Sequence, residues 1–225
     1  MPTSTRYKYV FSDPAAIRAR LARIDEPHVV PLNDLARRIA RETSRGVPWF
    51  DPDFGGIRAR VCILYATPPH HVRGTRFISA DNPDSSAKRT DETLKAVGLP
   101  RSDVVIWNAI PWHLPKTENG KPGRATKEDR KRGAAWLIEF LRLCANLRVI
   151  LLASRCAQEV GRLAHQLDTS AFTRMWVLAG LDAGSQAINR EPDRAARFEA
   201  AFREVARLRG APPPKSRPVF PDREF

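Results

Sequence analysis

Four short apolar runs, separated by stretches with helical spacing, constrain the fold of this chain more than any other feature. The runs lie at residues 60–65, 104–110, 147–153 and 175–179. Runs of this length and composition are typical of strands that are buried on both faces of a sheet. Because they alternate with helical segments, the sequence predicts an α/β fold with three layers, α/β/α, around a central and mostly parallel four-stranded sheet.

Start signals mark two of the helical segments. Asp13 followed by Pro14 predicts a helix that runs to about residue 23. Thr126, with Asp129 three positions later, predicts a capping box on a helix that runs to about residue 144. We expect further helices at 33–45, 91–97, 156–167 and 192–208, the last with Phe198, Phe202 and Val205 facing the core.

Composition divides the chain into three parts: a helical extension at 1–55, an α/β domain at 56–209 and a proline-rich basic tail at 210–225. No apolar run is long enough to span a membrane and the amino terminus lacks an export signal, so we expect a cytoplasmic protein without membrane association. Cys62, Cys144 and Cys156 are expected to be reduced core thiols, and no Cys/His spacing predicts a metal site.

The charge balance indicates a polyanionic partner. Lys and Arg number 38 against 25 Asp and Glu, which gives a net charge of +13. Most of the basic residues are arginines, and arginine binds phosphate through two parallel hydrogen bonds. No stretch is a basic amphipathic helix beside an apolar anchor, so nucleic acid is favoured over a membrane surface as the partner.

Asn108 stands where the second predicted strand should end, with Pro111 stopping the sheet just beyond it. Open α/β sheets bind their ligands at the carboxyl ends of the strands. An amide there can donate and accept hydrogen bonds, so it can pair with the polar edge of a base. The alternative is a buried asparagine that caps its own loop.

Small and polar residues cluster after three of the strands. The clusters are Ala66-Thr-Pro-Pro69 with residues 73–84, Trp107-Asn-Ala-Ile-Pro-Trp112, and residues 180–190. Together with residues 48–56 (PWFDPDFGG), they resemble the uracil-DNA glycosylase superfamily, especially a bacterial branch with sequences like GxxFISxDNxD and WNxxPW. The resemblance covers residues 45–205. It implies a four-stranded parallel sheet and a monomeric, nucleoid-associated enzyme that flips a base out of DNA and hydrolyses its N-glycosidic bond without metal or cofactor.

The resemblance also implies roles for single residues. Phe77 falls at the aromatic that stacks on the flipped base, Asn108 at the amide that reads its edge, and Asn82 in the same loop. Two positions depart from the family pattern. Thr67 stands where the family positions the attacking water with a carboxylate or amide, and it cannot be a general base at neutral pH. Asp182 replaces the histidine that stabilises the departing base.

Three explanations fit these departures. The pocket serves another base, such as a modified or glycosylated cytosine; or Asp84 or Asp182 positions the water and uracil remains the substrate; or catalysis is lost and the protein only binds DNA, in repair or phage defence. The first two are favoured because Phe77 and Asn108 persist. A nucleotide-binding enzyme is disfavoured, since no glycine-rich phosphate loop follows the first strand.

Basic and polar residues near these clusters are candidates for DNA contact, with a solvated charged surface as the alternative. They are Arg73, Arg76, Lys88, Arg89, Ser185, Gln186 and Arg190. His70 and His71 are expected to contact phosphate or to form a plain loop. His113 is expected to face the pocket or to belong to a lid.

Overall fold

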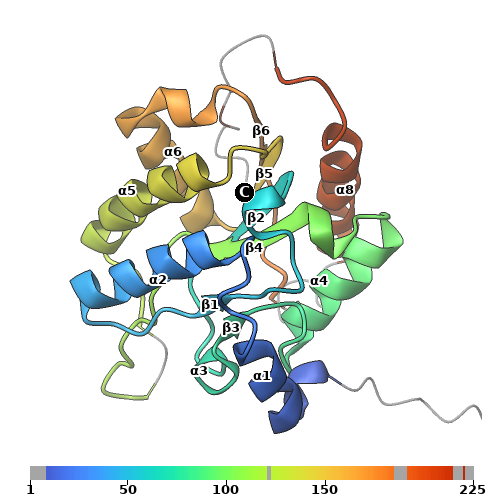
Figure 1. Ribbon diagram of the computed structural model, residues 1–225. Coiled ribbons are helices and arrows are strands. Elements are labelled where there is room, and N and C mark those ends of the chain that lie inside the picture. The colour runs from blue at the N-terminus through green and yellow to red at the C-terminus, as the bar shows by residue number, and fades with distance from the viewer. Residues whose placement is uncertain (1–8, 121–122, 185–191, 215–219, 221–225) are drawn as a thin grey trace, which may run out of the picture.

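Four parallel strands form the centre of the protein in the computed structural model, which describes residues 9–120, 123–184, 192–214 and 220 (Figure 1). Their order across the sheet is β4 (Val104–Asn108), β2 (Val61–Tyr65), β5 (Val149–Leu152) and β6 (Trp176–Ala179). The predicted α/β/α fold and its four-stranded parallel sheet are therefore confirmed. The strands are shorter than the predicted runs by one or two residues at their ends. The β4 strand ends at Asn108 rather than at residue 110, because the consecutive N–H groups of Ala109 and Ile110 both turn to the end of β2 instead of alternating as in a ladder.

Alternate residues of the strands face two separate hydrophobic clusters. In β2, Cys62 and Leu64 face the cluster that includes α2, α5 and α6, whereas Val61 and Ile63 face the cluster that includes α4 and α8. Figure 1 shows the same division, with α4 and α8 on one side of the sheet. The helices are α2 (Val30–Thr43), α4 (Ser85–Ala96), α5 (Lys127–Leu143), α6 (Arg155–Leu167) and α8 (Pro192–Leu208).

Several predicted helix ends are confirmed by their capping hydrogen bonds. Asp13 caps α1 (Pro14–Leu21) by accepting from the backbone N–H of Ala15 at 2.8 Å. Thr126 and Asp129 form the reciprocal capping box at the start of α5. On α8, the aromatic and aliphatic residues expected to face the core are buried: Phe198, Phe202 and Val205.

Two helices start earlier than the sequence indicated. We expected α4 to begin at residue 91, but it begins at Ser85, because Asp84 accepts hydrogen bonds from the backbone N–H groups of Ser86 and Ala87. The α2 helix begins at Val30 rather than at residue 33, with a proline in its first turn. The earlier start of α4 places Asp84 at the end of a helix rather than in a loop.

A second, two-stranded parallel sheet joins β1 (Trp49–Phe50) to β3 (Phe77–Ile78). The sequence indicated only a turn-rich link at β1, because a two-residue strand is too short to show an alternating pattern. A short helix, α3 (Val72–Thr75), precedes β3 and ends at Arg76, whose φ of 67° is left-handed. The remaining short 3-10 helices are Val10–Ser12, Gly56–Arg58, Arg101–Asp103 and Thr169–Phe172.

A buried network of ion pairs ties α1 to the loops around the small sheet. The Arg20 guanidinium pairs with Asp51 and, at 3.1 Å, with Asp81. Arg101 pairs with Asp81 at 2.8 Å and with Asp91 at 2.7 Å. Burial raises the pKa of Asp51, although the charge of Arg20 opposes this effect. Asp51 and Asp81, which lie in the segments that resemble the family, therefore stabilise the fold through ion pairs.

All three cysteines are free thiols, as expected from the sequence. Cys62 and Cys144 are buried and Cys156 is half-buried. Burial raises the pKa of each thiol above its ordinary value, which keeps all three protonated and unreactive at neutral pH. None of the helices in the described ranges is both long and apolar enough to cross a membrane.

Candidate functional site

A cavity of about 320 Å³ opens at the carboxyl ends of β2 and β4. The two strands end side by side, because Tyr65 and Asn108 are register partners. The cavity wall is completed by the residues after β2, by the segment from β3 to the first turn of α4, and by the loop after β6. This is the edge of the sheet at which open α/β folds bind ligands.

Asn108 lines this cavity and is 2% exposed. Its side-chain carbonyl Oδ1 is buried and has no hydrogen-bond partner in the described part of the chain. A buried acceptor without a partner is unfavourable by about 1–3 kcal/mol, so it marks a position where a ligand can supply the missing donor. Within the described residues no group of the loop donates to that oxygen, which agrees with the ligand-reading hypothesis for Asn108 and gives the loop-capping alternative no hydrogen bond to Oδ1.

The two tryptophans that flank Asn108 belong to the core. Trp107 stacks on Phe140 with ring centroids 4.4 Å apart. Trp112 is buried, and its indole N–H donates to Asp129 at 3.2 Å. Both rings therefore fix the position of the strand end, and neither lines the cavity.

The backbone after Asn108 is held from two sides. The N–H groups of Ala109 and Ile110 donate to the carbonyls of Tyr65 and Ala66, at 2.8 and 2.9 Å. From α5, Gly133 packs so closely that an added Cβ would lie 2.3 Å from the Ala109 carbonyl oxygen. Glycine is required at this position because a backbone carbonyl occupies the space that any side chain would need.

Asn82 lines the same cavity, but its amide is already used within the protein. Its Oδ1 accepts from the Thr75 hydroxyl at 2.6 Å, and its Nδ2 donates to the Phe77 carbonyl at 3.0 Å. These two bonds join α3, β3 and the start of α4 into one wall. Asn82 thus positions the loop rather than offering a free group to a ligand.

Phe77 does not line the cavity, in contrast to the stacking role that the family resemblance implies. It is fully buried, and its ring stacks on Phe11 with centroids 5.4 Å apart and an interplanar angle of 29°. The reason is the alternation of side chains along β3: Ile78 faces the cavity, so Phe77 faces the opposite side. Phe77 supports the wall from behind.

Tyr65 is the aromatic residue that does line the cavity, and it was not among the residues predicted to form the site. The Thr90 hydroxyl donates to the Ser86 carbonyl, which leaves the Tyr65 hydroxyl to donate to Thr90 at 2.7 Å. Burial raises the pKa of Tyr65, and the charges of Asp182 and Asp84 raise it further. The available signal was its position as the last residue of a predicted strand.

Asp84 forms part of the cavity wall and is paired with a histidine. Its Oδ1 accepts the two helix N–H groups of α4, while its Oδ2 lies 2.8 Å from His71 Nε2. Burial would raise the pKa of Asp84, but the hydrogen bonds from His71 and from the backbone outweigh this and hold it below its usual value. Asp84 is therefore a carboxylate at neutral pH. His70 and His71 are adjacent in the sequence, and no local pattern distinguishes the one that pairs with Asp84.

Asp182 contributes a second carboxyl group to the same cavity, from the loop after β6. Loss of hydration within the cavity wall raises its pKa, and a 3.1 Å hydrogen bond from the Gly184 N–H only partly opposes this. The cavity thus has two carboxyl groups whose surroundings shift their pKa values in opposite directions. Such a pair suits a division into base and acid. Thr67 lies in the wall between β2 and α3.

A wider cavity, of about 620 Å³, adjoins the first and shares Ala66 and Asp182 with it. Ser154, which caps α6, lies in its wall. Three arginines contribute to the same wall: Arg155, Arg194 and Arg197. Asp182 therefore stands between a mostly apolar pocket and a basic one.

The residues predicted to contact DNA differ in where the structure places them and in what they bind. Arg89 donates to the Ala183 carbonyl at 3.0 Å, so it positions the loop that carries Asp182. Lys88 lies 3.6 Å from Glu92 on the exposed side of α4. Arg73 and Arg76 are exposed beside a separate hollow that also includes His113, so His113 does not face the 320 Å³ cavity. The remaining candidates, Ser185, Gln186 and Arg190, lie outside the described residues.

No group of three or more His, Cys, Asp or Glu side chains could hold a metal ion within the ranges that the structure describes. The polar groups of the cavity are instead amide, hydroxyl and carboxyl groups, which suit an organic ligand with hydrogen-bonding edges. Comparison of the sequence with models of known protein families and with curated proteins gives no match.

Proposed function

We propose that this protein is a DNA glycosylase, which binds a flipped base in the 320 Å³ cavity and hydrolyses its N-glycosidic bond. The observation that carries the proposal is the buried, unbonded Oδ1 of Asn108 at the end of β4. The family resemblance around residues 73–84 and 107–112 adds support through Asn108 itself, whereas Phe77, its stacking residue, lies behind the cavity wall.

Recognition of the base rests on the Asn108 amide. Its Oδ1 needs a donor, which uracil supplies from its ring N3–H and cytosine from its exocyclic amino group. Its Nδ2 can donate to the neighbouring acceptor on the same edge. Tyr65 and Ile106 supply the apolar walls between which the ring lies. The cavity is at the small end of the range for ligand sites, which suits a single base.

The two carboxyl groups divide the chemistry. Water attacks the sugar C1′, the bond from C1′ to the base nitrogen breaks, and its electron pair leaves with the base. Asp84, held as a carboxylate by His71, orients the water and takes its proton. Asp182, whose pKa is raised, donates a hydrogen bond or its proton to the departing base. Thr67 helps to hold the water.

The DNA strand lies along the wider cavity on the other side of Asp182. The arginines at 155, 194 and 197 and the net charge of +13 supply the positive potential that phosphates require. The sugar links the base to the phosphates. With the base in one cavity and the phosphates along the other, the sugar would lie beside Asp182, which lines both. This explains why Asp182 belongs to both walls.

The test is base excision on defined substrates. Purified protein is incubated with single- and double-stranded oligonucleotides that carry uracil, a modified cytosine or a glycosylated cytosine, and abasic sites are cleaved with alkali. We expect strand breaks with at least one base, and a loss of about 10- to 100-fold in kcat/KM for Asn108→Ala, since one hydrogen bond to the base disappears. Salt-dependent DNA binding without abasic product from any base would contradict the proposal.

The pH profile tests the roles of the carboxyl groups. Asp84 must be ionised and Asp182 protonated, so activity falls as the pH drops through the lowered pKa of Asp84 and as it rises through the raised pKa of Asp182. Asp182→Asn keeps a donor that does not titrate, so the alkaline limb should disappear. Asp193→Asn, on the exposed start of α8, is the matched control and should keep both limbs.

A further inference from the structure

We propose that a second hollow binds a phosphate group, and we call it the arginine recess. It has a volume of about 290 Å³ and is lined by Trp49, Arg73, Arg76, His113 and the segment 46–48. It shares Val72 with the base cavity, so α3 contributes to both hollows. Its polar side chains take no part in the chemistry of the base cavity.

The backbone that forms the recess is fixed by hydrogen bonds between segments far apart in the sequence. The N–H of Trp49 donates to the Arg76 carbonyl at 2.8 Å, and the N–H of His113 donates to the Gly46 carbonyl at 2.9 Å. Arg76 adopts a left-handed φ of 67°, which is unfavourable for a residue with a long side chain. Such local strain is often retained where it directs a functional side chain.

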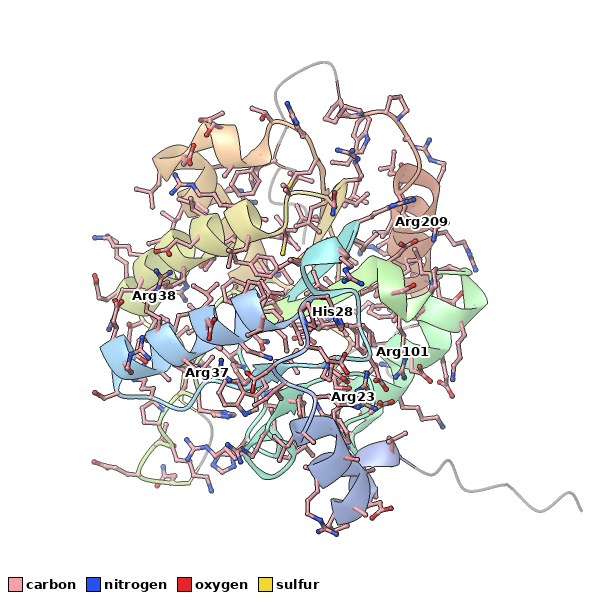
Figure 2. All side chains as sticks on the ribbon, in the orientation of Figure 1. Arg23, His28, Arg37, Arg38, Arg101 and Arg209 are labelled. Atoms are coloured by element: carbon pink, nitrogen blue, oxygen red, sulfur yellow. The ribbon has the colours of Figure 1, made fainter. Side chains whose placement is uncertain are left out.

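The charges in the recess are not neutralised by the protein. No carboxylate among the described residues pairs with Arg73 or Arg76, whereas Arg20 and Arg101 each pair with at least two aspartates. The other arginines labelled in Figure 2 are also paired: Arg23, Arg37, Arg38 and Arg209. The recess thus offers two guanidinium groups to an external anion.

Burial and the positive charges in the arginine recess both affect the pKa of His113. Burial lowers its pKa to about 4, and the charges of Arg73 and His70 contribute to this shift. His113 is therefore neutral at physiological pH, and its ring can donate one hydrogen bond and accept another. Two arginines beside a neutral histidine and an indole ring suit a phosphate, since guanidinium groups match phosphate oxygens in pairs.

The phosphate can come from two sources, the DNA backbone or a free phosphate group. A backbone source rests on the proposed function, because the recess would then hold a phosphate near the flipped nucleotide. The shared Val72 and the exposure of both arginines support this source. Phosphate binding itself does not depend on base excision.

Inorganic phosphate and the NMR signals of His113 test the recess without DNA. We expect phosphate to shift the His113 ring signals and to raise its pKa, because the anion offsets the charge of Arg73. The variant Arg73→Ala/Arg76→Asn should have a higher His113 pKa without phosphate and should show no response to it. Asparagine is chosen because it tolerates the left-handed backbone at 76. An unchanged response in this variant would overturn the proposal.

Binding of undamaged duplex DNA tests the backbone source. For one phosphate held in the recess, the variant should bind DNA with a log–log salt slope that is shallower by about 1. The control, Arg203→Ala/Arg207→Ala, also removes two charges, but from the exposed face of α8. An equal change in both variants would overturn a dedicated recess. A lost phosphate response with an unchanged slope would support the recess with free phosphate as its source.

The two proposals fail in distinguishable ways. If no base is excised but the variant still loses its phosphate response, the recess stands and the glycosylase proposal falls. If excision proceeds and the variant behaves as the control in both binding experiments, the recess proposal falls alone. Unfolding temperatures of both variants should stay close to that of the unmodified protein, because all four arginines are exposed and the two ion pairs lost in the control lie at the surface.

Discussion

Two walls of the same cavity contain an asparagine, and the two asparagines differ in one respect. Asn82 and Asn108 are 4% and 2% exposed and both line the pocket. The amide of Asn82 bonds to Thr75 and to the Phe77 backbone, whereas the Oδ1 of Asn108 bonds to nothing described. Burial and residue type alone therefore do not distinguish a structural amide from one that is available to a ligand. The hydrogen-bond partners do.

The charged groups show the same contrast. Asp51 and Asp81 stand in sequences that resemble family motifs, and both are held by Arg20 in a buried network. Arg73 and Arg76 belong to the same family-like segment as Asp81, yet neither has a carboxylate partner among the described residues. Polar groups that have partners within the protein should contribute to the free energy of unfolding. Polar groups that have none should contribute to the affinity for a ligand. The following experiments can break or sharpen this division.

The largest effect on stability is expected for Arg20→Leu. The substitution leaves the carboxylates of Asp51 and Asp81 buried without one of their cations, which should lower the free energy of unfolding by about 3–5 kcal/mol. Urea unfolding measures the change. As a control, Arg203→Leu breaks an exposed pair with Glu199 and should cost about 1 kcal/mol or less. Equal losses in both variants would mean that the buried network is not special.

Truncation to alanine should lower the free energy of unfolding at Asn82 and change it little at Asn108. Asn82→Ala removes two hydrogen bonds and leaves the Thr75 hydroxyl and the Phe77 carbonyl unpaired, so we expect a loss of about 2 kcal/mol. Asn108→Ala removes an acceptor that has no partner, and stability should change by less than about 1 kcal/mol. Thermal and urea unfolding of both variants, beside their excision activity, test this. A large stability loss for Asn108→Ala would contradict the division.

Asp84 should show a smaller effect that depends on pH. Its pKa in the folded protein is lowered, so its ionised form stabilises the fold above the pKa of the unfolded chain. This contribution is lost as the pH falls through the folded pKa. Asp84→Asn should therefore lower stability by about 1 kcal/mol at pH 7, and the difference should shrink toward pH 3. Urea midpoints at several pH values measure it. If the difference in stability between the unmodified protein and Asp84→Asn grew as the pH fell, the lowered pKa of Asp84 would be contradicted.

The framework of the fold could be predicted because its signals are local. The apolar runs define β2, β4, β5 and β6, and the capping residues Thr126 and Asp129 define the start of α5. Asn108 could be placed at the edge of the sheet for the same reason. Parallel strands bring their carboxyl ends together, so the location of the cavity follows from the strand pattern.

The rest of the site depends on contacts between distant segments, which the sequence does not show. The direction of Phe77 depends on β3, a strand of two residues that is set by its pairing with β1. The pairing of His71 with Asp84 depends on where α4 begins. The Arg20 network joins residues separated by 31 and 61 positions. For each of these, the local sequence was compatible with more than one arrangement.

The close packing of Gly133 against the Ala109 carbonyl limits how this cavity can change during evolution or redesign. This contact fixes the backbone just after Asn108, and because it joins a glycine to a backbone carbonyl it cannot be adjusted by exchanging side chains. A new ligand preference is therefore expected to arise through cavity side chains that lie in loops, such as Thr67 and Asp182. At both positions the sequence departs from the pattern of the family that it resembles.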